Sequence, residues 1–190
     1  MPKNKIPKNA KLVFKGLMFD VYQWQQKMFD GSYVTYEAIK RQGTVVIIPT
    51  MGNKILTTIE TQPNIPWTVG LIAGKIEREE KPLHSAKREL LEEAGLKSND
   101  WELLHVHDAN NSRKVDWNIY TYVARDCKKV AEPKLEPGEK IKIRMVDLST
   151  FFKLPENAKR MDGFLVDYIN KIKNSKEEQE KFKKKLFKNK

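Results

Sequence analysis

The 190-residue sequence contains a single cysteine and only three histidines. Cys127 has no second cysteine with which to form an internal disulfide, and nothing around it suggests a nucleophile or a metal cluster. We interpret it as a small apolar filler. His105 and His107 have the spacing of a strand, and three histidines are too few for a zinc site. The sequence therefore excludes a disulfide scaffold and does not favour cysteine or histidine chemistry.

Long apolar runs are also absent. No uninterrupted apolar segment approaches the ~20 residues that a membrane-spanning helix needs, and the lysine- and asparagine-rich start lacks the apolar stretch of a signal peptide. Apolar residues make up 39% of the chain and charged residues 32%, which is ordinary for one soluble domain that buries its own core. We therefore expect a cytoplasmic protein that has no membrane contact.

The formal net charge of +11 is confined to the two ends of the chain. Residues 1–15 hold five lysines and no acid, and residues 171–190 hold nine lysines against three glutamates. Residues 16–170 are neutral, with 22 basic and 22 acidic side chains. This disfavours a nucleic-acid-binding domain, whose charge should lie on the folded surface. We expect a basic leader at 1–15, one domain at 16–172 and a lysine-rich helical tail at 173–190.

Turn signals and hydrophobic periodicity predict a mixed α/β fold. Aromatic and β-branched residues at 19–28 and 33–40, separated by an Asp-Gly pair, predict an N-terminal β-hairpin. Further strands are expected at residues 44–48, 54–61, 69–73, 101–107, 117–124 and 140–146. Residues 62–67 contain two prolines and are predicted to form a loop. Helical periodicity at 82–94 and 161–172 completes a mixed sheet sandwiched between helices.

The chemistry lies in one segment, residues 74–96, which reads GKIEREEKPLHSAKRELLEEAGL. Gly74 is followed after five residues by Glu80 and after seven more by the run RELLEEAGL. This pattern resembles the Nudix box of the Nudix hydrolase superfamily, with every defining position filled. At background residue usage, a chance match is roughly a one-in-ten-million event. The competing interpretation, a solvated helix face with ordinary salt bridges, does not explain why Gly74, Glu80 and Gly95 are in register.

The same residues suggest a metal site from their positions alone. At ~100° per residue, Glu89, Glu92 and Glu93 share an arc of about 100° on the predicted helix. Like charges this close repel one another unless cations occupy the site. Ligand sets made only of oxygen suit hard cations such as Mg²⁺, which in turn hold substrate phosphates. Arg88 lies four residues before Glu92 and can orient it by pairing.

The resemblance implies a Nudix fold in which a loop, a helix and a loop carry one to three divalent cations, with Mg²⁺ as the expected cofactor and Mn²⁺ as a substitute. The implied metal ligands are Glu89, Glu92, Glu93 and the main-chain carbonyl of Ala73. Glu80 and Arg88 are implied supporting residues. The implied reaction is attack of a metal-polarised water on one phosphorus of a pyrophosphate.

A general base for this reaction must be a carboxylate within reach of the water. Glu93 is one candidate. ADP-ribose pyrophosphatases carry a second kind of candidate, a glutamate in the loop before the last strand, where this sequence offers Glu136 and Glu139. Glu139 is the better placed of the two because it adjoins the predicted strand. An ordinary polar turn at Pro137-Gly138 is the alternative explanation of this loop.

Two further segments resemble ADP-ribose and nucleotide-sugar pyrophosphatases, namely RQGTVVIIP at residues 41–49 and AGKIE at residues 73–77. Ile72 replaces the proline that is usual in this branch, and Gln62-Pro63-Asn64 replaces its Gln-Tyr-Arg. These departures weaken the case for ADP-ribose more than that for a nucleotide sugar. The substrate-binding candidates are Arg41 for a phosphate, Trp67 for stacking on a base, and Gly74 and Glu80 from the box.

We therefore expect a metal-dependent hydrolase that cleaves the pyrophosphate of a nucleoside diphosphate derivative, ADP-ribose or a nucleotide sugar, to a nucleoside monophosphate and a phosphorylated product. Two alternatives stay open. One is a sanitising nucleoside triphosphate pyrophosphatase with a different base pocket. The other is an RNA-directed Nudix protein, a cap hydrolase or a binding module, that uses the lysine-rich ends. Homodimers are frequent among ADP-ribose pyrophosphatases, so a homodimer is expected.

Overall fold

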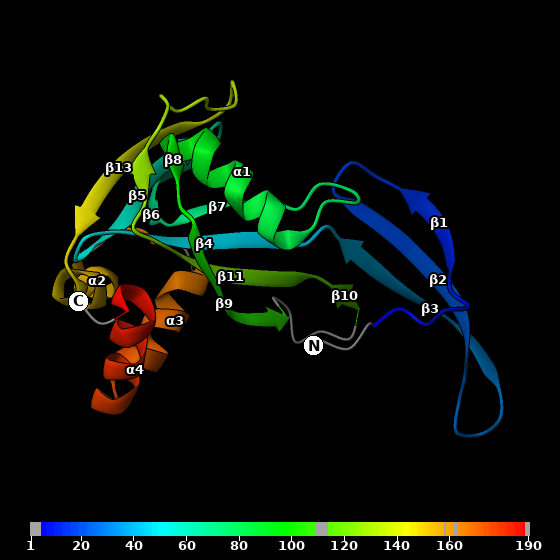
Figure 1. Cartoon of the computed structure of the whole chain (residues 1–190). Coiled ribbons are helices and arrows are strands. Elements are labelled where there is room, and N and C mark those ends of the chain that lie inside the picture. The colour runs from blue at the N-terminus through cyan, green and yellow to red at the C-terminus, as the bar shows by residue number, and fades with distance from the viewer. Residues whose placement is uncertain (1–4, 109–113, 158, 162, 189–190) are drawn as a thin grey trace.

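The computed structural model describes residues 5–108, 114–157, 159–161 and 163–188. The first strands form an antiparallel sheet that extends away from the rest of the molecule (Figure 1). This N-terminal sheet contains β1 (Lys11–Lys15), β2 (Phe19–Lys27), β3 (Tyr33–Arg41) and the short β10 (Val115–Asp116), which is parallel to β3. The predicted hairpin is confirmed, since β2 pairs with β3 along its whole length.

The central sheet has the strand order β13-β5-β4-β11-β9. Its strands are β4 (Thr44–Met51), β5 (Lys54–Gln62), β9 (Asp100–Asp108), β11 (Asn118–Arg125) and β13 (Lys140–Val146). Only the β4–β11 pair in this order is parallel. β4 and β5 pair next to their connecting turn, and then each takes another partner. β5 pairs with β6 (Ile65–Gly70) and β4 pairs with β7 (Ile72–Lys75), so the sheet divides at this point.

The loop prediction for residues 62–67 is wrong, because β6 begins at Ile65 and includes Pro66. Proline lacks the N–H that a strand ladder needs, but it is tolerated in an edge strand. β6 is such a strand, with β5 on one side and a single bridge from Val69 to Met161 on the other. The strand predicted at 69–73 is also divided, since β6 ends before Leu71 and β7 begins after it.

Helices cover both faces of the central sheet, as predicted (Figure 1). α1 (Pro82–Ala94) lies on one face, and α2 (Leu148–Asn157), α3 (Gly163–Lys173) and α4 (Lys176–Phe187) gather on the other. Strand alternation divides β4 between two cores: Val45 and Ile47 belong to the core under α1, whereas Val46 and Ile48 belong to the core under the other helices. None of the described helices has the length and apolarity to cross a membrane.

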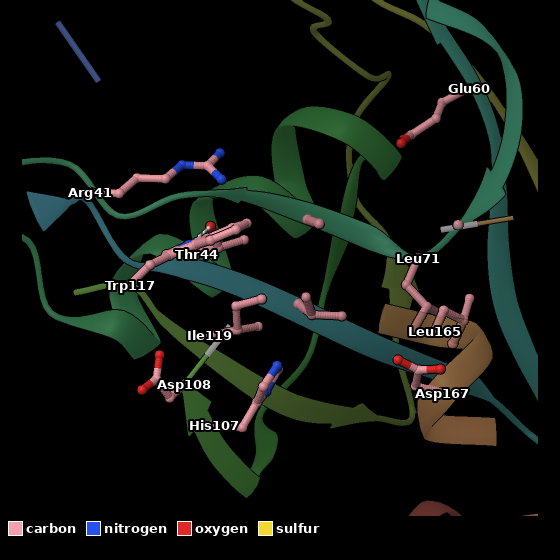
Figure 2. Close-up of a pocket in the computed structure, with 13 residues that line it drawn as sticks. Arg41, Thr44, Glu60, Leu71, His107, Asp108, Trp117, Ile119, Leu165 and Asp167 are labelled. Atoms are coloured by element: carbon pink, nitrogen blue, oxygen red, sulfur yellow. Dashed lines mark hydrogen bonds between the residues drawn. The ribbon is translucent and has the colours of Figure 1, made fainter. Parts of the chain in front are cut away.

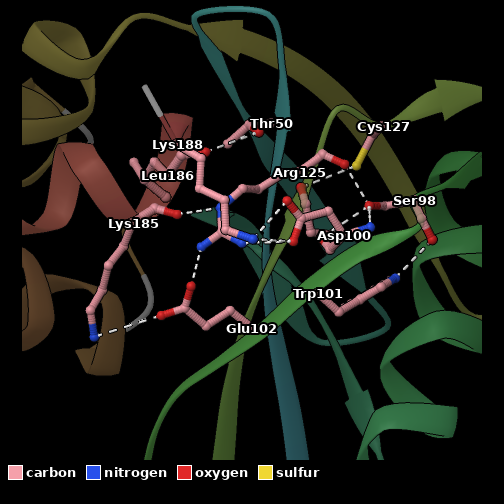
Figure 3. A network of polar contacts seen from close by, with 11 residues as sticks. Thr50, Ser98, Asp100, Trp101, Glu102, Arg125, Cys127, Lys185, Leu186 and Lys188 are labelled. Carbon is pink, nitrogen blue, oxygen red and sulfur yellow. Dashed lines mark hydrogen bonds and ion pairs between the residues drawn. The ribbon is translucent and has the colours of Figure 1, made fainter. Parts of the chain in front are cut away.

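As far as residue 188, the lysine-rich segment predicted at 173–190 is part of the folded structure. Phe182 and Leu186 of α4 are buried in the core that also contains Phe151 and Ile169. An ion network fixes the same helix against β9 and β11 (Figure 3). At its centre is the buried Arg125, which contacts Asp100, Glu102 and the main-chain carbonyl of Lys185. These contacts make α4 a structural helix, with its remaining lysines facing solvent.

Two short strands form a small ribbon beside α1. β8 (Leu96–Lys97) pairs antiparallel with β12 (Lys128–Lys129). Between α1 and β8, Gly95 has a left-handed conformation with φ 64°, and its N–H donates to the carbonyls of Leu90 and Leu91. Glycine favours this conformation because it has no Cβ. The predicted exit of the box helix at Gly95 is therefore confirmed, and the helix bounds match the prediction.

Candidate active site

The carboxylates of the box lie on α1, which is held against the sheet by Ala86, Leu90 and Ala94, all of them buried. Glu89 and Glu93 adjoin this apolar face and are only 9% and 5% exposed. Glutamate is rarely buried to this extent unless it is paired or binds a metal. The amphipathic pattern of the box thus carries two carboxylates into the interior, and their surroundings determine what they can do.

Gly74 of β7 makes room for the Glu89 carboxyl group. A Cβ atom built at residue 74 would lie 2.0 Å from Cδ and 2.1 Å from Oε1 of Glu89. No side-chain carbon can approach another group so closely, so any larger residue at position 74 would displace Glu89. The glycine of the box is therefore a steric requirement of its first helical glutamate.

Arg88 connects the box carboxylates. Its Nη1 donates to Oε1 of Glu89 at 2.8 Å and to Oε2 of Glu92 at 3.0 Å. On the other side, Nη2 donates to Oε2 of Glu80 at 3.2 Å and to the main-chain carbonyl of Lys75. Glu80 also accepts a 2.6 Å hydrogen bond from the hydroxyl of Ser85. Arg88 thus pairs with Glu92, as its spacing of four residues predicted, and joins Glu80 and Glu89 to the same guanidinium.

Glu93 has no such counter-charge. Its Oε2 is buried and has no hydrogen-bond partner among the described residues, although the main chain of Ala73 is hydrogen-bonded to the carboxyl group. Burial raises the pKa of Glu93 to about 9, and the negative charges of Glu89, Glu60 and Glu139 add to this rise. A carboxyl group of this kind either stays protonated or requires a cation.

Glu89 belongs to the same electrostatic cluster. Burial raises its pKa to about 6, the charge of Arg88 opposes the rise, and Glu92 and Glu139 increase it. Glu139 therefore lies close enough to influence both buried carboxylates, as a general base in the loop before β13 should. Glu136 is exposed and joined to Glu139 by a tight turn, in which the Glu139 N–H donates to the Glu136 carbonyl at 2.9 Å.

A cavity of about 620 Å³ adjoins this cluster and lies mostly on the sheet face opposite α1 (Figure 2). Glu60 and Ala73 connect it to the carboxylates, since both line its wall and both act on Glu93. At the other end, the Arg41 guanidinium lies 3.9 Å from the ring centroid of Trp117. The lining residues are Arg41, Thr44, Val46, Glu60, Gly70, Leu71, Ala73, His107, Asp108, Trp117, Ile119, Leu165 and Asp167.

Arg41, predicted to bind substrate, thus lines the cavity, whereas Trp67 does not. Trp67 lies on β6, 44% exposed, with Nζ of Lys142 5.0 Å from its ring centroid. Trp117 occupies the position at the cavity wall, and its indole N–H donates to Oγ1 of Thr44 at 3.0 Å. The structure therefore places a different tryptophan next to the space that a substrate can occupy.

The comparison with known proteins agrees with this geometry. A NUDIX domain is found over residues 40–168, which is more than half of the chain. The chain belongs to the Nudix family. A curated relative, an ADP-ribose pyrophosphatase of Bacillus subtilis (strain 168), is 24% identical over 163 residues, covering 83% of this chain and 88% of the relative. The predicted resemblance to this branch and the predicted enzyme class, a Nudix pyrophosphohydrolase, are confirmed.

A solved structure described as an ADP compounds hydrolase has the same fold. It superimposes with a TM-score of 0.69 at 19% sequence identity, covering 88% of this chain and 91% of that chain. Nudix enzymes generally use divalent metal cations. The buried, unpartnered Oε2 of Glu93 and the surrounding carboxylates are oxygen donors of the kind that hard cations prefer.

The carboxylates of Glu89, Glu92 and Glu93 do not surround one common point in this structure. Among the described residues, no three His, Cys, Asp or Glu side chains form a group that could hold a metal ion. The reason lies in Arg88, whose guanidinium draws Glu89 and Glu92 to itself. The carboxylate oxygens of Glu89, Glu92 and Glu93 are of the kind that hard cations prefer.

Proposed function

We propose that this Nudix protein is a Mg²⁺-dependent pyrophosphatase that cleaves nucleoside diphosphate derivatives, with ADP-ribose or a nucleotide sugar as substrate. One observation carries the proposal: the buried Glu93, with an unpartnered Oε2, is hydrogen-bonded to the main chain of Ala73, and Ala73 lines a cavity large enough for a nucleotide. Ligand cavities commonly measure about 300 to 1,000 Å³, and this one measures about 620 Å³. Mn²⁺ is the expected substitute for Mg²⁺.

The proposed metal ligands are Glu89, Glu92, Glu93 and the main-chain carbonyl of Ala73. When bound, Mg²⁺ neutralises the pyrophosphate charge and lowers the pKa of a coordinated water. The chain supplies the geometry. Gly74 leaves space for the Glu89 carboxylate beside β7, and Arg88 orients Glu89 and Glu92 by donating one hydrogen bond to each.

We propose that Glu139 is the general base that accepts the proton of the attacking water. It is half-buried, it lies near Glu89 and Glu93, and its loop joins a strand that flanks the cluster. Glu93 is less suited as a base because it is proposed to bind the metal. At the far end of the cavity, Arg41 offers a planar cation for the substrate's phosphate or base. ADP-ribose is proposed as a substrate because the similar protein of Bacillus subtilis is an ADP-ribose pyrophosphatase.

The test is a product analysis in Mg²⁺. The purified chain is incubated with ADP-ribose, nucleotide sugars, dinucleoside polyphosphates, nucleoside triphosphates and capped RNA, and the products are separated and identified. We expect AMP and ribose 5-phosphate from ADP-ribose, or the corresponding pair from a nucleotide sugar. Preferential release of pyrophosphate from triphosphates, or of a cap nucleotide from RNA, would instead favour one of the two alternative activities.

Substitution of Glu93 tests whether the box is catalytic. We expect Glu93→Gln to lower kcat by about a hundredfold or more, since the variant keeps the shape and loses the charge of a metal ligand. The matched control is Glu156→Gln on α2, an exposed glutamate that pairs only weakly with Lys173 at 3.2 Å. Near-normal turnover of the Glu93 variant would refute the role of the box.

We also propose that the chain forms a homodimer through its N-terminal sheet. No described helix covers β1, β2 and β3, and large apolar side chains are exposed along these strands and between β1 and β2. They are Leu12, Val13, Phe14, Leu17, Met18, Phe19, Tyr33, Val34 and Tyr36. Strand alternation distributes them over both faces of the sheet, and large exposed apolar surfaces favour association. Light scattering should give a dimer mass for the natural chain and a monomer mass for Phe14→Asp, whereas a monomeric natural chain would contradict the proposal.

A further inference from the structure

Glu60 lies where the central sheet divides, and no sequence motif marks it. It belongs to β5, in the part that pairs with β6, and lies opposite Thr68 in the ladder. Its carboxylate approaches Gly70 of β6, where a built Cβ atom would lie 3.6 Å from Oε1 of Glu60. Glu60 and Gly70 both line the wall of the cavity.

Thr58, two residues before Glu60, is a second polar side chain near Gly70. Strand alternation places Thr58 and Glu60 on the same face of β5, and a Cβ atom built at Gly70 would lie 3.3 Å from Oγ1 of Thr58. The Thr58 hydroxyl is completely buried, and it has no hydrogen-bond partner among the described residues. A buried hydroxyl without a partner costs free energy.

Glu60 and Glu93 approach the junction from two separate elements. In Figure 2 the Glu60 carboxylate projects from β5 toward α1. Its negative charge contributes to the raised pKa of Glu93, which places the two carboxyl groups within electrostatic reach of each other. Arg88 contacts Glu80, Glu89, Glu92 and the Lys75 carbonyl. Its positive charge therefore compensates the negative charges of these three glutamates.

We propose that Glu60 is a further carboxylate of the metal site, so that a divalent cation is held between β5 and α1 by Glu60 together with Glu93. The inference rests on the proposed metal-dependent hydrolysis and extends it to a residue outside the Nudix box. Glu60 borders the cavity directly, so a cation between these two groups faces the space for the substrate pyrophosphate. Its ligand shell then links the box helix to the opposite wall of the site.

The test compares metal binding and kinetics in three variants. Mn²⁺ binding to the substrate-free protein is measured by titration calorimetry for the natural chain, Glu60→Gln, Glu60→Asp and the control Glu156→Gln. We expect Glu60→Gln to raise the Mn²⁺ Kd by about 10- to 100-fold and to lower kcat with the same metal. Glu60→Asp, which keeps the charge on a shorter side chain, should recover part of both, and Glu156→Gln should match the natural chain.

The outcomes separate this inference from the proposed function. Failure of the natural chain to bind Mn²⁺ and to hydrolyse any pyrophosphate substrate would remove the proposed function together with the inference. Binding and turnover in the natural chain, with an unchanged Mn²⁺ Kd in a folded Glu60→Gln variant, would overturn only the role of Glu60. Melting temperatures measured without metal establish that each variant is folded, and Glu60→Asp carries the test if Glu60→Gln does not fold.

Discussion

Glu93 should make the metal-free protein less stable as the pH rises. Its pKa is about 9 in the fold, against an ordinary value of 4.5 for a glutamate in the unfolded chain. The folded state therefore retains a proton that the unfolded state releases, and stability falls as the pH rises from about 4.5 to 9. One retained proton gives a slope of about 1.4 kcal/mol per pH unit, or roughly 2 to 3 kcal/mol between pH 5 and pH 7.

Replacing Glu93 with glutamine removes this titration and keeps the shape of the side chain. For a chain of this size, 1 kcal/mol corresponds to about 2 to 4 °C in Tm, so the natural chain in EDTA should lose about 5 to 10 °C between pH 5 and pH 7. Glu93→Gln should lose much less. Glu89 remains in the variant and contributes a smaller fall near pH 5 to 6, since its pKa is about 6.

The assay is thermal unfolding at constant ionic strength, in EDTA and in saturating Mg²⁺. If a cation binds Glu93, Mg²⁺ should stabilise the natural chain more at pH 8 than at pH 5, because protons compete with the metal at low pH. The variant should show little of this gain. Parallel Tm profiles for both proteins in EDTA would refute the reasoning, because they would mean that Glu93 is ionised in the fold and compensated by another group.

Four further substitutions test other parts of the structure. Gly74→Ala should displace Glu89, and both Mn²⁺ affinity and kcat should fall by about tenfold or more; calorimetry that shows normal binding would contradict the steric argument. Arg41→Ala should raise KM by several-fold, while Trp67→Ala should leave it nearly unchanged; the reverse order would place the substrate on β6. Leu186→Ala should lower the free energy of unfolding by about 2 to 5 kcal/mol without changing KM, and a loss below 0.5 kcal/mol would mean that α4 is loosely held.

The box helix and its exit could be predicted from sequence because their determinants are local. The spacing of Glu89, Glu92 and Glu93 fixes their common face, and Gly95 ends the helix through its own conformation. The alternating strands were equally accessible, since β13 has the predicted bounds of residues 140–146. Wherever a residue's role depends on its near neighbours in the chain, the sequence is sufficient.

The remaining site residues depend on strand pairing, which the sequence does not reveal. Glu60 looks like an ordinary polar position in a strand until β6 places Gly70 beside it. Trp117 gains its place through the pairing of β11 with β4, which aligns it with Arg41 and the cavity. The loop prediction for residues 62–67 failed because it rested on two prolines, whereas β6 is an edge strand that pairs with β5 and can include Pro66.

The change of partner at Leu71 has a mechanical consequence. The two walls of the site, β5–β6 and β4–β7, are joined there by one residue that is 5% exposed and packed in the core under α3. A bulkier substrate would have to push these two walls apart and so displace the packed Leu71 side chain. The packing of the core under α3 therefore opposes widening of the site. Because Leu71 also lines the cavity, the volume of the side chain at position 71 sets the width of the site both directly and through this packing.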